Sequence, residues 1–232
     1  MLVSHYDYDK AIEQMAATLA HEVKNPLSLV KANIDLLELL DAEKDHAKNY
    51  RIMRREIERI NDMLLDFIQF AKPIDTELAP IEMMPMITEI LDMIKLSYGN
   101  RDNLQLQYSC DEAGLCVMGD ADKIRRVFLN VIKNGMEAIA EKEEEETGLI
   151  QVSIHGEKNW VRIMFMDNGK GMDDEQLQKL NRPFYTTKLG GSGLGLMICR
   201  NIVEEHRGLF EIAGKPGEGC SVTITLPRAD FI

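Results

Sequence analysis

Residues 15–40 read MAATLAHEVKNPLSLVKANIDLLELL, and this stretch decides the architecture of the first part of the chain. Its apolar side chains recur every three or four positions, which is the spacing of one face of an α-helix. They are Ala16, Leu19, Val23, Leu27, Val30, Ile34 and Leu37. The sequence therefore predicts a helix that packs through one continuous apolar stripe.

His21 lies two positions from its nearest neighbours in this stripe, which turns it about 200° away from each of them. We therefore expect its imidazole to face solvent while the opposite side of the helix packs. Glu22 is adjacent, Asn25 lies one turn on, and Pro26 interrupts the hydrogen-bond ladder beside them, which predicts a bend. A lone exposed histidine is usually a solvated surface residue, so a reactive role for His21 depends on these neighbours and on the motifs further along the chain.

A second helix is predicted from residue 51 to residue 71, where the apolar positions alternate between steps of four and three. These positions are Met53, Ile57, Ile60, Leu64, Phe67 and Ala71. A single hairpin of two helices leaves much of both stripes exposed, and pairing two chains into a four-helix bundle is the simplest way to cover them. We predict that residues 1–73 form a helical-hairpin dimerisation domain and that the protein is a homodimer.

Beyond Pro73 the pattern changes to a mixture of strands and helices. The segment up to Pro85 holds three prolines and is predicted to be a linker or an edge segment. Strands are predicted at 104–108, 115–118, 149–155, 160–166, 209–213 and 221–226, and helices at 86–98, 121–141 and 193–206. Helices beside a mixed sheet form a two-layer α/β sandwich, so the chain is of the α+β class with its second domain over residues 74–232.

The formal net charge of −12 disfavours nucleic acid and anionic membrane surfaces as direct partners. No apolar run approaches the roughly 20 residues of a membrane span, and the first residues carry no signal-peptide core. The four cysteines form no CxxC pair, so we expect neither a zinc site nor a disulfide framework. These features favour a cytoplasmic fragment, and an upstream region that anchors a longer protein to a membrane is compatible with them.

Asn130 and Asn134, in NVIKNGMEAI, place two carboxamides one turn apart on one helix face. Amide oxygens with this spacing can complete the oxygen shell of a Mg²⁺ ion that also binds phosphates. Two asparagines four positions apart are more often plain surface residues, so this signal is weak by itself.

In DNGKGM, Asp167 ends an apolar strand and enters a glycine turn. A carboxylate held at a strand end can accept a hydrogen bond from an exocyclic amino group such as that of adenine. Gly169 and Gly171 can let the backbone approach a flat ring, although a tight turn explains them equally well.

The segment PFYTTKLGGSGLGL supplies four glycines that lead directly into a helix, and backbone amides at a helix N-terminus favour phosphate. The preceding residues, 172–189, have the features of a movable lid, with Lys188 available to meet a phosphate. A glycine loop alone is a weak signal. Three such elements in this order predict a nucleotide site.

The motifs HEVKNPL, NVIKNGMEAI, DNGKGM, PFYTTK and GSGLGL together resemble the H, N, G1, F and G2 boxes of sensor histidine kinases, in the order of that family and over nearly the whole chain from Ala11. The second helix, REIERINDMLLDFIQFAKP, further resembles the sporulation kinases of spore-forming bacteria. The resemblance implies an ATP-binding domain of the kind shared by histidine kinases and Hsp90.

By this resemblance His21 is the phosphoacceptor, Glu22 orients its ring and Asn25 positions water for dephosphorylation of a receiver domain. Asn130 and Asn134 would hold Mg²⁺, and Asp167 would read adenine. The remaining nucleotide contacts would come from Asn134, Gly169, Gly171, Met172, Thr187, Lys188, Gly191, Gly193, Leu194, Gly195 and Leu196.

Two positions depart from the family pattern. Gly135 stands where alanine commonly follows the second asparagine, which we expect to be tolerated because only size is at stake. Cys220 stands where threonine is common, so no adenine contact is assigned to it. His5, His155 and His206 lie outside the motifs and are interpreted as surface or core residues without a functional role.

The expected function is ATP-dependent autophosphorylation of His21, followed by transfer to an aspartate of a response-regulator receiver in a two-component system or phosphorelay linked to sporulation. An inhibitor protein bound to the helical bundle is a further possible partner by resemblance. Two other classes stay open. An ATPase of the chaperone or mismatch-repair kind carries glutamate where Asn130 stands, because hydrolysis needs a general base. A docking module without kinase activity would not need all the motif residues present here.

Overall fold

The computed structural model describes residues 23, 25, 26, 28–30, 32, 33, 36, 52, 53, 56, 57, 60, 78–98, 103–142, 147–180, 182, 185, 186 and 193–229. The chain divides into two compact units, of which one holds residues 1–73 and 182–194 and the other residues 74–181 and 195–232. Among the described residues, no helix has the length and apolar character needed to cross a membrane.

In the first unit, the described residues between positions 23 and 60 are helical. Met53 of the predicted second stripe is buried, whereas Ile57 of the same stripe is 50% exposed in the single chain. Asn33 is also buried, and its side-chain amide donates a hydrogen bond of 2.8 Å to the carbonyl of Leu29 one turn earlier. The helical prediction is therefore correct for the described residues. Among them, Ile57 of the second stripe is not buried by other residues of the same chain.

The second unit is built from seven strands and four helices among its described residues. In chain order they are β1 (Ala79–Glu82), α3 (Met83–Tyr98), β2 (Leu104–Cys110), β3 (Cys116–Gly119), α4 (Ala121–Ala140), β4 (Gly148–Gly156), β5 (Trp160–Asp167), α5 (Asp174–Lys179), α6 (Gly195–Glu205), β6 (Leu209–Lys215) and β7 (Gly219–Pro227). Five strands form a sheet in the order β2-β4-β5-β7-β6, with only the β2–β4 pair parallel, and β1 pairs with β3 in a second sheet.

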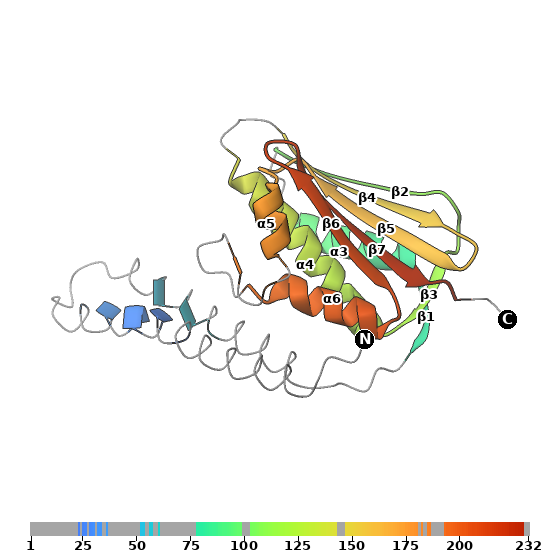
Figure 1. The fold of residues 1–232 in the computed structure, drawn as a ribbon, viewed down its shortest axis with the longest axis horizontal. Helices are drawn as coiled ribbons and strands as arrows, with labels where there is room; N and C mark the ends of the chain where they lie inside the picture. The colour runs from blue at the N-terminus through green and yellow to red at the C-terminus, as the bar shows by residue number, and fades with distance from the viewer. Residues whose placement is uncertain are drawn as a thin grey trace. The chain divides into compact units, whose positions relative to one another are not determined.

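The helices α4 and α6 lie against one face of the five-stranded sheet (Figure 1). The strands alternate because successive side chains point to opposite faces: in β4, Val152 and Ile154 are fully buried while Gln151 and Ser153 between them are half-buried. Phe128 of α4 meets Phe165 of β5 with ring centroids 5.3 Å apart. This core fixes α4 beside the end of β5, where the predicted site residues lie.

The mixed α/β prediction is confirmed, and its element ranges agree with the structure within a few residues. Helix α3 begins earlier than predicted, at Met83, because Pro85 falls in its first turn, where a missing N–H costs no helical hydrogen bond. The three-proline segment contains the edge strand β1. Helix α5 was not predicted: it has only six residues, and it begins with a capping box between Asp173 and Gln176.

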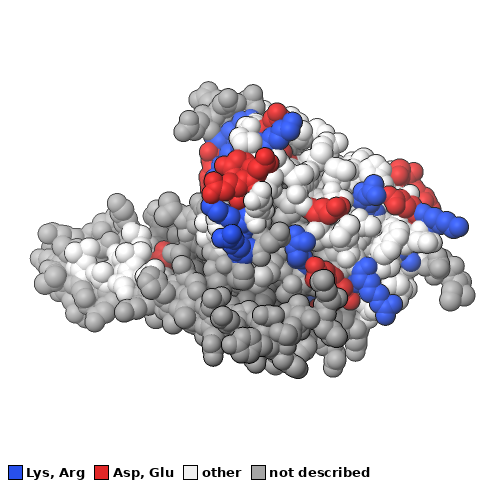
Figure 2. Space-filling model, viewed as in Figure 1, with Lys and Arg blue, Asp and Glu red and all other residues white. Residues whose placement is uncertain are grey.

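Acidic and basic side chains are interspersed over the described surface that faces the viewer in Figure 2. Several form ion pairs across the fold, such as Arg125 with Glu89 at 2.9 Å and Lys123 with Glu205 at 3.1 Å. The Arg125–Glu89 pair is largely exposed, and pairs of this kind contribute about 0 to 1 kcal/mol of stability each. The four cysteines are all free, with Cys116 and Cys199 buried.

Candidate active site

Asp167 is the last residue of β5, and its carboxylate is held by one backbone amide of the turn that follows it and one of β7. Its Oδ1 accepts a hydrogen bond of 2.9 Å from the amide of Gly169 and one of 3.3 Å from the amide of Cys220 in β7. Amide donors favour the charged form of a carboxylate and fix its orientation. The strand end therefore presents an oriented carboxylate, as the interpretation of DNGKGM requires.

The loop after Asp167 is clamped between α4 and the hairpin that joins β6 to β7. The amide of Lys170 donates to the carbonyl of Ala138 at 3.2 Å, and the amide of Gly217 donates to the carbonyl of Lys170 at 2.7 Å. Gly171 adopts a left-handed conformation with φ of +69°, and a Cβ there would overlap the carbonyl oxygen of Lys215. Gly171 therefore allows two segments of the protein's own backbone to come close together. That it also lets the backbone approach a ligand ring remains a prediction.

Asn168 supports the backbone beside Asp167, a role that the motif interpretation missed. Its Oδ1 accepts a hydrogen bond of 2.7 Å from the amide of Leu149, and its Nδ2 donates one of 2.9 Å to the carbonyl of Thr147. The backbone amide of Asn168 also donates to the carbonyl of Leu149 at 3.2 Å. The backbone directly after Asp167 is therefore tied to the start of β4 through the side chain and amide of Asn168. The only sequence signal for this role is an asparagine that immediately follows a predicted strand.

Asn130 and Asn134 lie one turn apart on α4, and the Nδ2 of Asn134 donates a hydrogen bond of 3.1 Å to the Oδ1 of Asn130. The structure therefore brings this predicted pair together. Gly195, the first residue of α6, packs directly against the same amide, because a Cβ there would lie 2.8 Å from the Nδ2 of Asn130. The start of the helix that follows the glycine loop thus contacts the paired asparagines.

The donor set on α4 fits Mg²⁺, which prefers hard oxygen ligands and keeps water or phosphate oxygens in much of its shell. Within the described part of the chain, no three His, Cys, Asp or Glu side chains cluster as a metal site. A divalent ion at Asn130 and Asn134 would therefore need further ligands from a bound phosphate group. This chemistry suits an ion that binds together with a nucleotide.

Cys220 is half-buried, and its environment suppresses ionisation of the thiol. Burial, followed by the negative charge of Asp167, raises the pKa of Cys220 to about 11. The side chain is therefore a neutral thiol near pH 7. Its backbone amide nevertheless donates a hydrogen bond to Asp167. Nothing in the sequence indicated this role, because the family pattern concerns only the side chain at position 220.

The remaining predicted residues are distributed between the two units. Met172 directly follows Gly171 and is half-buried, and Leu196 is half-buried in α6. Gly193, with φ of +66°, and Leu194 end the part of the first unit that spans residues 182–194. Asn25 is helical and exposed. Five predicted site residues lie outside the described residues: His21, Glu22, Thr187, Lys188 and Gly191.

Two family models match the chain. Residues 11–75 match the His Kinase A (phospho-acceptor) domain, and residues 119–230 match the Histidine kinase-, DNA gyrase B-, and HSP90-like ATPase domain. The first range includes the HEVKNPL motif, and the second includes the α4 asparagines, Asp167 and the glycine loop. The two matches occur in the order that the motifs predict.

The chain is similar to named histidine kinases over nearly its whole length. It is 34% identical to sporulation kinase D of Bacillus subtilis, with 93% of this chain and 42% of the relative covered. It is 30% identical to the sensor histidine kinase ZraS of Escherichia coli, with 94% and 46% covered. It is 31% identical to sporulation kinase B of Bacillus subtilis, with 96% of this chain and 51% of the relative covered. The chain thus spans about half the length of the curated relatives it matches.

Solved structures agree with this fold. The histidine kinase ThkA in complex with the response regulator protein TrrA aligns with a TM-score of 0.78 at 24% identity, covering 98% of this chain and 68% of that one. The catalytic domain of ThkA alone aligns with a TM-score of 0.57 at 27% identity, covering 66% of this chain and 96% of that one. With both domain matches in place, the chain belongs to the sensor histidine kinases and carries their phosphoacceptor and ATP-binding domains in that order.

Proposed function

We propose that this chain is the catalytic core of an ATP-dependent protein-histidine kinase that phosphorylates its own His21 and passes the phosphoryl group to an aspartate of a response-regulator receiver. The observation that carries the proposal is the carboxylate of Asp167, held at the end of β5 by the amides of Gly169 and Cys220. It lies in the segment that matches the ATPase family, and His21 lies in the segment that matches the phosphoacceptor family. Residues 1–73 would then be the phosphotransfer domain and residues 74–232 the ATP-binding domain.

Nucleotide recognition would begin at Asp167, whose oriented carboxylate is suited to accept a hydrogen bond from the amino group of adenine. Gly169, Gly171 and Met172 would border the base. Thr187, Lys188 and Gly191, with Gly193, Leu194, Gly195 and Leu196, would close over the triphosphate as a lid and a glycine loop. The amides at the start of α6 favour anionic oxygens there.

Asn130 and Asn134 would hold Mg²⁺ through their amide oxygens, with phosphate oxygens completing the shell. A bound Mg²⁺ supplies positive charge beside the phosphates. The hydrogen bond between the two carboxamides orients them on the side of α4 that meets Gly195. Asn130 also argues against ATP hydrolysis as the main activity, because its side-chain amide cannot act as a general base toward water.

The chemical step would join a ring nitrogen of neutral His21 to the γ-phosphorus of ATP. The bond from that phosphorus to the β,γ-bridging oxygen breaks, and ADP leaves with the electron pair. Glu22 would orient the ring and accept its other proton as positive charge develops. Asn25, which is helical and exposed, would position water in the reverse reaction that dephosphorylates the receiver.

We also propose that the chain is a homodimer whose paired hairpins form a four-helix bundle. The half-exposed Ile57, which belongs to the predicted apolar seam, supports this, because a second copy would cover it. A receiver domain would dock on the helices beside His21; ThkA, a structural relative, is named in complex with a response regulator. An inhibitor protein on the bundle is a further candidate partner.

A link to sporulation is supported by the relatives named as sporulation kinases, although the similarity to ZraS is of the same order. The net charge of −12 supports a fragment without nucleic-acid or direct membrane contacts. Free cysteines support a reducing cytoplasmic location for this fragment.

Labelling with γ-³²P-ATP tests the proposal. The wild-type chain should incorporate label, and His21→Ala should incorporate none while binding ATP with unchanged affinity. His46→Ala, which changes a histidine between the two predicted helices, is the matched control and should label normally. Label on the His21→Ala variant would refute the acceptor assignment. Mixing His21→Ala with Asp167→Asn chains then decides whether ATP bound to one subunit phosphorylates His21 of the same subunit or of its partner, since labelling is restored only in the second case.

A further inference from the structure

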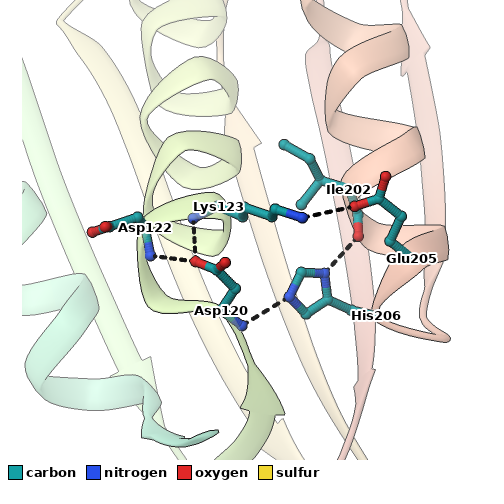
Figure 3. Close-up of polar contacts among 6 residues, drawn as sticks. All are labelled: Asp120, Asp122, Lys123, Ile202, Glu205 and His206. Atoms are coloured by element: carbon teal, nitrogen blue, oxygen red, sulfur yellow. Dashed lines mark hydrogen bonds and ion pairs between the residues drawn. The ribbon is translucent and has the colours of Figure 1, made fainter. Parts of the chain in front are cut away.

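His206 is a buried histidine for which the proposed reaction has no use. It lies directly after α6 with 2% of its surface exposed, and both ring nitrogens have backbone partners. The amide of Asp120 donates a hydrogen bond of 2.9 Å to Nε2, and Nδ1 lies 2.6 Å from the carbonyl oxygen of Ile202 (Figure 3). Since the amide can only donate and the carbonyl can only accept, the ring must be neutral, with its hydrogen on Nδ1.

This ring connects two helices that matter to the nucleotide site. Asp120 caps the N-terminus of α4, where its carboxylate accepts from the amides of Asp122 and Lys123 at 3.1 and 3.2 Å. Lys123 in turn pairs with Glu205 of α6 at 3.1 Å, next to His206 in sequence (Figure 3). The end of α6 is therefore fixed to the start of α4 by one buried histidine and one ion pair.

The same two helices meet again at Asn130. They run antiparallel, so that His206 meets the start of α4, the thiol of Cys199 lies 4.0 Å from the carbonyl of Val127, and Gly195 packs on the Asn130 side chain. A Cβ on Gly195 would lie only 2.8 Å from the Nδ2 of Asn130, so this contact does not tolerate a slip of one helix along the other.

We propose that neutral His206 is a positioning residue that fixes the register of α6 against α4, and thereby the place of Asn130 in the nucleotide site. The inference rests on the proposed function, because it assumes that Asn130 and Asn134 serve a bound nucleotide.

Both hydrogen-bond partners of the ring are backbone groups, one just before α4 and one near the end of α6. The ring therefore fixes the distance between the two helix ends without depending on the rotamer of a partner side chain.

The test measures the dissociation constant of Mg²⁺–ADP by calorimetry at pH 7.5. His206→Gln keeps an acceptor near the place of Nε2, whereas His206→Ala keeps neither hydrogen bond. We expect His206→Gln to bind within about threefold of wild type and His206→Ala to bind roughly tenfold more weakly.

The Asn130 side-chain amide resonances should shift in His206→Ala and stay near their wild-type positions in His206→Gln. His155→Gln is the matched control, since His155 is half-exposed on β4 beside Asp111, and it should follow the wild type. Wild-type affinity in His206→Ala overturns the inference, and so does an unmoved Asn130 signal in that variant. If the wild type does not bind Mg²⁺–ADP at pH 7.5, the proposed function fails and the inference with it; if it binds and only the His206 effects are missing, the inference alone fails.

Discussion

The backbone amide of Cys220 donates a hydrogen bond of 3.3 Å to the Oδ1 of Asp167, although the two residues are 53 positions apart in the chain. The pairing of β5 with β7 brings them together, and Gly169 donates to the same oxygen at 2.9 Å. A carboxylate that is oriented from two directions can discriminate among ligands, because it does not rotate to suit each of them.

Asp167→Asn should weaken ATP binding by about 10- to 100-fold, which is the range for losing a hydrogen bond to a charged partner. The amide side chain has one acceptor oxygen instead of two, and it needs that oxygen for the amides of Gly169 and Cys220. Calorimetric titration with ATP measures the loss, and size-exclusion chromatography should show an unchanged oligomeric state. Asp111→Asn is the control, because Asp111 also accepts a backbone amide, that of Gly156 at 3.0 Å. Equal affinity in Asp167→Asn and wild type contradicts the role.

Cys220 should react slowly with iodoacetamide near pH 7.5, because only the thiolate reacts and the pKa of this thiol is raised to about 11 by burial and by Asp167. The rate should climb as the pH rises toward that value. In Asp167→Asn the nearby negative charge is gone, so the pKa falls and alkylation at pH 8 should be faster. Mass spectrometry in a Cys110→Ser background follows the reaction, since Cys110 is the other partly exposed cysteine. A rate that does not respond to Asp167→Asn shows that burial alone protects the thiol.

Asn168→Ala should lower the free energy of unfolding by about 1–3 kcal/mol, because it leaves the amide of Leu149 and the carbonyl of Thr147 without their side-chain partner. It should also raise the KM for ATP more than it lowers kcat, since Asn168 holds the backbone beside Asp167. Asn168→Asp, which keeps the acceptor and loses the donor, should fall between alanine and wild type. Urea unfolding and steady-state labelling measure the two effects. The exposed Asn159, in the turn between β4 and β5, provides a control substitution to alanine.

The sequence predicted the long elements of this fold because their periodicity is strong. The range predicted for α4 differs from the observed helix by one residue at its C-terminal end, and the predicted strand at 149–155 lies within β4. The short elements β1 and α5 could not be predicted from periodicity. Six residues in α5 cannot display a stripe, and β1 consists of four residues with an internal proline.

The site could be predicted as a set of motifs but not as a set of contacts. Asp167 and the asparagine pair could be predicted as site residues because each stands in a recognisable local pattern. The roles of Cys220 and His206 depend on partners 53 and 86 positions away, which no local pattern shows. Gly135 illustrates the same point: a Cβ there would lie 3.2 Å from the Cβ of Asp167, so its size bears directly on the site.

Gly171→Ala should destabilise the fold more than Gly217→Ala, although both glycines have left-handed backbones, with φ of +69° and +77°. A Cβ at Gly217 meets nothing within 4 Å, so its substitution costs only the left-handed conformation, about 1–2 kcal/mol. A Cβ at Gly171 also overlaps the carbonyl of Lys215, so the loop after Asp167 must separate from the hairpin between β6 and β7. Urea unfolding gives the two costs, and their difference isolates the close approach from the backbone term. Equal costs contradict the clamp, whereas a larger cost at Gly171 that is accompanied by weaker ATP binding ties the clamp to the position of the carboxylate.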